Sequence, residues 1–161
     1  MKTPGLSKEQ LSVLAEWLLA PDIYEFIQKG GSVSAFPKRY LPELSALQSS
    51  VRIVQAGLEI AGQKGKDWIP AHALAVSHAL APDAFPREEI SYEQAVAYLR
   101  KEAVTLSDAA PRGVVLLTYK NMPLGFVKNI GNRANNLYPQ EWRIRSGHLP
   151  EKPKIVISYK L

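Results

Sequence analysis

Cysteine is missing altogether from the 161 residues of this chain. A disulfide framework and any metal site built from thiolates are therefore excluded. The three histidines add no metal signal, because His72 and His78 lie six positions apart and neither has a nearby cysteine or a histidine at i+4. We therefore expect no bound metal.

Long apolar runs are missing as well. No segment approaches the ~20 apolar residues that a membrane-spanning helix needs, and the first residues, MKTPGLSKEQ, lack the apolar core of a secretion signal. With 46% hydrophobic and 22% charged residues, the composition is that of an ordinary globular protein and not of a disordered chain. These features predict a cytoplasmic protein with no membrane partner.

Catalytic motifs are equally scarce. There is no P-loop and no G-x-S-x-G sequence. A Rossmann-type cofactor domain would need a glycine-rich loop after its first strand, but Gly30-Gly31 and Gly125 are isolated. The adjacent Glu88 and Glu89 read as a solvated turn before a helix. The sequence predicts no catalytic residue and no cofactor.

Basic charge, by contrast, is concentrated in the last third of the chain. Residues 1–110 carry 11 Lys and Arg against 13 Asp and Glu, a net −2, whereas residues 111–161 carry 9 against 2, a net +7. A basic segment next to a near-neutral one indicates a polyanionic partner. The alternative is a basic surface that is simply solvated.

The hydrophobic periodicity predicts an α+β protein in two parts. Ser7 and Ser91, each with a glutamine three residues later, signal the N-caps of helices that end near Ala20 and Lys101. The shorter predicted elements are strands at 24–27, 32–36, 51–55, 58–61, 104–106 and 154–159 and a helix over 71–80. Two prolines within 81–86 mark a boundary between a small α+β domain, residues 1–84, and a second domain, residues 85–161.

Residues 113–145 organise the second domain. Two apolar runs, 113–119 and 123–127, flank the polar pair Lys120-Asn121 and predict a β-hairpin. A loop rich in asparagine, glycine and arginine begins at Lys128 and leads into an aromatic segment. Aromatic rings interleaved with cations and asparagines beside a small sheet are typical of an RNA-binding surface. The expected core residues of the hairpin are Leu116, Leu117, Leu124 and Phe126.

The segment PLGFVKNIGNRANNLYPQEWR resembles the C-terminal domain of bacterial RsmF-type ribosomal RNA cytosine methyltransferases. That domain is a small PUA-like barrel with a similar hairpin, a PLG step, a lysine, an N-x-Y-P element and a W-R pair; the N-x-Y-P element matches Asn136, Tyr138 and Pro139. Upstream, AFPKRYLPEL, GLEIAGQKGKDWIPAHALAVSHAL and ISYEQAVAYLRKE agree with the same family. The resemblance implies a PUA-like β-barrel over residues 85–161.

Methylation of cytosine in that family uses a cysteine thiolate as the nucleophile, which this chain cannot supply. The resemblance therefore implies a non-catalytic RNA-binding region that docks ribosomal RNA or the small ribosomal subunit for a separate methyltransferase catalytic domain. The alternative is a protein-interaction or scaffold module whose first domain packs on that catalytic domain. A stand-alone RNA-binding regulator is a third interpretation.

Side chains between positions 128 and 145 supply the expected RNA contacts. The cations, expected at phosphates, are Lys128, Arg133, Arg143 and Arg145. The amides of Asn135 and Asn136 either contact a base edge or cap the turn. The rings of Tyr138 and Trp142 either stack on a base or pack over the end of the barrel.

Overall fold

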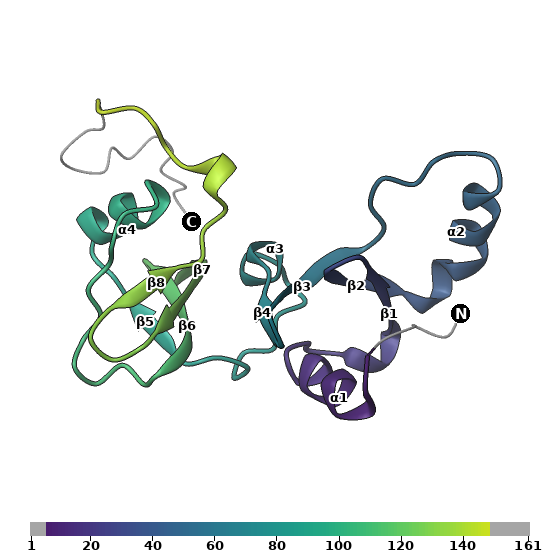
Figure 1. The fold of residues 1–161 in the computed structure, drawn as a ribbon, viewed down its shortest axis with the longest axis horizontal. Helices are drawn as coiled ribbons and strands as arrows, with labels where there is room; N and C mark the ends of the chain where they lie inside the picture. Colours follow the sequence, from purple (N-terminus) through teal and green to yellow (C-terminus); the bar gives the residue numbers. More distant parts are fainter. Residues whose placement is uncertain (1–5, 149–161) are drawn as a thin grey trace, which may run out of the picture. The chain divides into compact units, whose positions relative to one another are not determined.

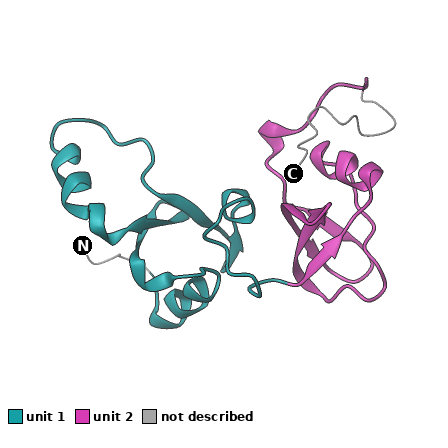
Figure 2. Ribbon diagram, turned by 180° about the vertical axis from the view of Figure 1, so that it is seen from behind, with its two compact units in different colours: residues 1–85 teal, residues 86–161 magenta. Residues whose placement is uncertain are grey.

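The structure is a computed structural model that describes residues 6–148 (Figure 1). The chain divides into two compact units, residues 1–85 and residues 86–161 (Figure 2). Each unit contains a four-stranded sheet and helices, so the protein is α+β, as the sequence predicts.

The first unit is an antiparallel sheet in the order β1-β2-β3-β4 with three helices. Its elements are α1 (Lys8–Glu16), β1 (Tyr24–Lys29), β2 (Ser32–Pro37), α2 (Leu41–Gln48), β3 (Leu58–Lys64), β4 (Asp67–Pro70) and α3 (His72–Ala75). Single 3-10 turns lie at Pro21–Ile23 and Lys38–Tyr40. The predicted hairpin at 24–36 is confirmed as β1 and β2, and Gly30 adopts a φ of +59° in its turn.

Both helices predicted from capping signals are present. The first, α1, ends at Glu16 and not near Ala20 as predicted. The Ser7 hydroxyl accepts a hydrogen bond from the backbone N–H of Gln10 at 3.2 Å. The side-chain oxygen of Gln10 accepts one from the backbone N–H of Ser7 at 2.8 Å. The helix ends at Glu16 because the next residues pair with residues 79–81: Leu19 N–H donates to the Ala79 carbonyl.

That pairing also corrects the helix predicted over 71–80. Residues whose backbone bonds to residues 17–19 cannot continue a helix, so α3 covers only His72–Ala75. The strand predicted at 51–55 was wrong: residues 49–57 form an irregular connection, and β3 begins directly at Leu58. Gly57 enters β3 with a φ of +78°, where a Cβ atom would lie 2.5 Å from the Ala35 carbonyl oxygen.

The second unit has a mixed sheet in the order β5-β6-β7-β8, with β5 parallel to β6 and the other pairs antiparallel. Its elements are β5 (Arg87–Glu89), α4 (Tyr92–Leu99), β6 (Gly113–Tyr119), β7 (Met122–Asn129) and β8 (Ala134–Asn136), followed by a 3-10 turn at Gln140–Trp142. The Ser91 and Gln94 capping box starts α4 as predicted.

The predicted β-barrel is not closed by the described residues. Within residues 86–148, β5 and β8 are three-residue edge strands that do not pair with each other. The segment predicted as a strand at 104–106 contributes a single bridge, Val104 to Ala134. The strand predicted at 154–159 lies outside the described residues.

The central hairpin is confirmed, and both residues of its turn adopt the left-handed backbone conformation. Lys120 and Asn121 adopt φ values of +50° and +60°, as a two-residue type I′ turn requires. Leu117 pairs with Gly125 but Thr118 pairs with Pro123, so Leu124 forms a bulge. The loop predicted from Lys128 onward is shorter than expected, because β7 runs to Asn129 and residues 134–136 return as β8.

The core of this unit lies between α4 and the sheet. Its buried residues are Ile90, Ala95, Tyr98, Val104, Val115, Leu117, Val127 and Ala134. Three of the predicted core residues, Leu116, Leu117 and Phe126, are fully buried, and Leu124 is half-buried. The Tyr98 hydroxyl donates to the Phe126 carbonyl at 3.1 Å, and burial raises the pKa of this phenol. This bond fixes α4 to the centre of the sheet.

Candidate nucleic-acid interface

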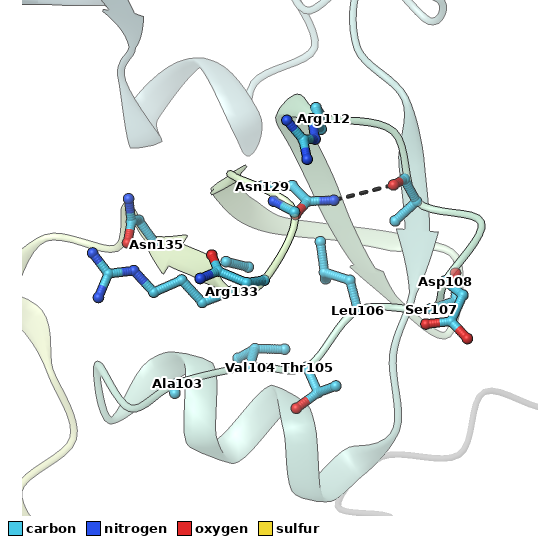
Figure 3. A pocket seen from close by; sticks show the side chains of 14 residues that line it. Ala103, Val104, Thr105, Leu106, Ser107, Asp108, Arg112, Asn129, Arg133 and Asn135 are labelled. Atoms are coloured by element: carbon cyan, nitrogen blue, oxygen red, sulfur yellow. Dashed lines mark hydrogen bonds between the residues drawn. The ribbon is translucent and has the colours of Figure 1, made fainter.

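A polar groove of about 730 Å³ opens beside β8 in the second unit. One wall is the segment 103–112, which connects α4 to β6, and the other is the end of β7 with the loop to β8. Figure 3 shows Leu106 near its centre, Arg112 above, Arg133 and Asn135 on one side, and Ser107 and Asp108 on the other. Backbone pairing of Gly113 with Asn129 brings the two walls together.

Two guanidinium groups stand at the edge of this groove. Arg112 and Arg133 are both exposed, and neither side chain makes a hydrogen bond or ion pair with another residue of the described range 6–148. Arg112 lies against Gly131, where a Cβ atom would be 2.9 Å from its Nη2. Because Gly131 has a φ of +103° and no side chain, the guanidinium can rest on the loop.

Asn129 holds the two walls in place. Its side chain is buried, and its amide nitrogen donates to the carbonyl of Ala110 at 3.1 Å (dashed in Figure 3) and to that of Pro111 at 3.0 Å. Its side-chain oxygen accepts from Gly131 N–H at 2.9 Å. The loop is closed by a bond from Ile130 N–H to the Arg133 carbonyl. Asn129 therefore fixes the backbone that carries both arginines.

The floor of the groove is apolar. Val104 and Ala134, which form the bridge between the walls, are buried, and Leu106 is half-buried against the core. An apolar floor with a cationic and amide rim can accept a flat ring on its face while holding negative charge at its edge.

Two of the residues predicted for RNA contact line this groove, namely Arg133 and Asn135. Asn136, the next residue, does not line it. Its amide nitrogen donates to the carbonyls of Tyr98 at 2.8 Å and Glu102 at 3.0 Å, and its oxygen accepts from Tyr138 N–H at 2.9 Å. Of the two roles predicted for Asn136, this geometry is that of the turn cap.

The aromatic and cationic residues farther along occupy a different place. The Tyr138 ring is half-buried against Tyr98, with centroids 5.4 Å apart. Lys101, at the end of α4, donates to the carbonyls of Asn136 and Tyr138. Arg143 and Arg145 are exposed on the segment after Gln140–Trp142, which is tied to α4 by a bond from Ile144 N–H to the Leu99 carbonyl at 2.9 Å.

The predicted cations therefore do not form one cluster: Lys128 lies on β7, and Arg143 and Arg145 follow the 3-10 turn at Gln140–Trp142. Arg133 lines the groove, whereas Lys128, Arg143 and Arg145 do not. The structure adds Arg112 and Asn129, which the sequence did not single out as contacts. Among the described residues, no helix is long and apolar enough to cross a membrane.

A helix-capped mixed sheet with a cationic groove beside its hairpin defines the second unit as a small module with a surface suited to a polyanion. Residues 85–144 match the family model described as the methyltransferase RsmF PUA domain. This match confirms that these residues resemble the C-terminal PUA-like region of RsmF-type proteins.

Curated relatives extend this similarity beyond the second unit. The chain is 31% identical over 106 residues to ribosomal RNA small subunit methyltransferase F of Shigella flexneri serotype 5b (strain 8401), which covers 66% of the chain and 22% of that protein. Proteins of the same name from Citrobacter koseri and Cronobacter sakazakii are 32% identical over 124 residues and 28% over 160. These matches cover 76% and 94% of the chain but only 24% and 31% of the relatives, so the chain spans between a fifth and a third of their length.

Proposed function

We propose that this chain is a non-catalytic RNA-binding region that docks ribosomal RNA for a methyltransferase catalytic domain. The observation that carries the proposal is the groove with Arg112 and Arg133 at its edge. The distribution of charge also supports RNA binding by the second unit. Residues 86–161 carry 12 Lys and Arg against 7 Asp and Glu, whereas residues 1–85 carry 8 Lys and Arg against 8 Asp and Glu. The whole net charge of +5 thus belongs to the unit that contains the groove.

Guanidinium groups are well suited to RNA phosphates, since their planar donors can form two parallel hydrogen bonds to one phosphate. Neither groove arginine has an ion-pair partner among residues 6–148, so binding a phosphate would break no pair within that range. The relatives are named as ribosomal RNA small subunit methyltransferases, which supports ribosomal RNA or the small ribosomal subunit as the partner.

The experiment is a gel shift of the full chain with a ribosomal RNA fragment at several salt concentrations. We expect log affinity to fall with log salt, and Arg133→Ala or Arg112→Ala to reduce that slope by about 0.7–0.9 each while weakening binding to all sequences alike. The matched control is Arg87→Ala, which removes an exposed arginine of the same unit that does not line the groove. Equal losses of affinity for Arg87→Ala and Arg133→Ala would contradict the groove as the contact surface.

We also expect the chain to lack methyltransferase activity by itself. It has no cysteine to attack a cytosine ring, and the part that matches the family model is a PUA domain. Calorimetry with S-adenosylmethionine is expected to show no binding heat. A micromolar site for this cofactor would contradict the non-catalytic assignment.

One feature of the first unit favours a second candidate function, a module that packs on the catalytic domain. Leu47, Val51 and Val54, at the end of α2 and in the connection after it, are 52%, 53% and 83% exposed. Clustered exposed apolar residues mark protein interaction surfaces. A chain that copurifies with a methyltransferase domain, loses it on Val54→Asp, and shows no salt-dependent RNA shift would support this candidate over RNA docking.

A further inference from the structure

The groove has the dimensions and lining of a pocket for a flat, polar ligand. Its volume of about 730 Å³ falls within the ~300–1,000 Å³ typical of small-molecule sites. The half-buried Leu106 lies near the centre of the groove, and the polar side chains of Arg112, Arg133 and Asn135 stand around it (Figure 3). A surface that contacted only a phosphate backbone would need no such floor.

The amide of Asn135 gives the groove a means of contacting a base edge. Asn135 is exposed on β8, lines the groove, and makes no side-chain hydrogen bond within residues 6–148. A side-chain amide offers both donors and an acceptor, the same combination that base edges present. Asp108, on the facing wall, adds a carboxylate that can accept from an exocyclic amino group.

A paired RNA helix cannot use these features. In a duplex the bases are stacked and their edges are paired, and the major groove is too narrow for side chains to read. An unpaired nucleotide, by contrast, exposes its ring faces and its edge together, with a phosphate on either side.

We propose that the groove of the second unit holds unpaired nucleotides of RNA. The base lies on Leu106 in the floor, its edge faces Asn135, and the flanking phosphates lie at Arg112 and Arg133. This inference rests on the proposed RNA-binding function and specifies the class of RNA that the groove accepts.

The test uses the full chain and three fluorescent RNA probes in an anisotropy titration. The probes are a single strand of about ten nucleotides, a length within the usual site size, the same strand annealed to its complement, and an abasic strand of equal length that keeps the phosphates. We expect the single strand to bind at least about tenfold more tightly than either other probe at equal salt, a difference of about 1.4 kcal/mol.

Variants then separate the base contact from the phosphate contacts. Asn135→Ala is expected to weaken binding of the single strand several-fold and to leave the abasic strand unaffected, whereas Arg133→Ala should weaken binding of all three probes. Arg87→Ala, at an exposed position of β5 outside the groove, should leave the preference for the single strand unchanged.

The outcomes distinguish this inference from the function on which it rests. Abasic or duplex RNA that binds as tightly as the single strand would overturn the unpaired-nucleotide assignment while RNA binding itself stands. The same holds if Asn135→Ala leaves the preference intact, because the base would then be held elsewhere. If none of the three probes binds, the RNA-binding function fails as well.

Discussion

Asn135 and Asn136 are adjacent in β8 but have opposite surroundings. Asn135 is exposed at the groove, whereas the amide of Asn136 makes three hydrogen bonds to the backbone around Tyr98, Glu102 and Tyr138. We expect Asn136→Ala to lower the free energy of unfolding by about 1–3 kcal/mol, because partly buried backbone groups lose their partners. Urea unfolding measures this change.

The matched control is Asn135→Ala, which should change the free energy of unfolding by no more than about 0.5 kcal/mol. The assignment of a structural role to Asn136 would be wrong if its replacement weakened RNA binding at unchanged stability.

Tyr138 is the other residue for which the sequence left two roles open. Its ring is half-buried against Tyr98 and packs on the core of the second unit. We expect Tyr138→Ala to destabilise the protein by roughly 3 kcal/mol through the cavity that it leaves. Tyr138→Phe keeps the ring and is the control, since it removes the hydroxyl with its long 3.4 Å hydrogen bond to the Trp142 carbonyl and leaves the packing in place. Thermal unfolding of both variants distinguishes packing from base stacking: a stacking residue would lower RNA affinity with little change in melting temperature.

At the scale of elements, the β6–β7 turn depends on a carboxylate from β5. Glu89 accepts a hydrogen bond from the Thr118 hydroxyl at 2.6 Å and from Asn121 N–H at 3.3 Å. The Thr118 hydroxyl, together with backbone N–H groups of the turn, lowers the pKa of Glu89 below its ordinary value of 4.5.

A lowered folded-state pKa means that the ionised Glu89 stabilises the fold above pH 4.5 and loses this effect as the pH falls through the folded-state pKa. We therefore expect Glu89→Gln to melt at a lower temperature than the parent chain at neutral pH. The difference should shrink as the pH falls below about 4.5, when the carboxyl takes up its proton. Melting curves between pH 7 and pH 3 provide the measurement, and a difference that persists at pH 3 would contradict the role of the charge.

The elements that the sequence predicted well are those with strong local signals. The capping boxes at Ser7 and Ser91 and the two hairpins each depend on residues a few positions apart. The sequence did not reveal α2, where only Leu44 is buried, so its apolar periodicity is weak. The strand predicted at 51–55 was wrong because β-branched residues such as Val54 indicate a strand even where no neighbour is available to pair with it.

Two groove residues, Arg112 and Asn129, could not be predicted from the sequence because their positions depend on strand pairing between distant segments. Arg133 and Asn135 belong to a loop whose composition indicates RNA contact. Arg112 is a single cation before β6, and only the antiparallel pairing of Gly113 with Asn129 places it opposite that loop. Asn129 was likewise counted as a loop residue, whereas its buried amide joins the two walls.

At the scale of the whole molecule, each unit has its own sheet and its own buried residues. We expect a fragment of residues 85–161 to fold independently, with the circular dichroism spectrum and cooperative melting of a native domain. The predicted boundary at residues 84 and 85 should also be the region that a protease cuts first in the full chain. An unfolded fragment beside a folded full chain would mean that the two units share one cooperative structure.

The parallel pairing of β5 with β6 has a consequence for the order in which the second unit forms. Arg87 pairs with Leu116, and α4 and the whole groove wall of residues 103–112 lie between them in sequence. During synthesis, β5 leaves the ribosome first but has no partner until β6 has emerged, whereas β6 and β7 are joined by two residues and can pair at once. The hairpin is therefore expected to form first and to serve as the template on which the earlier strand and the groove wall are assembled.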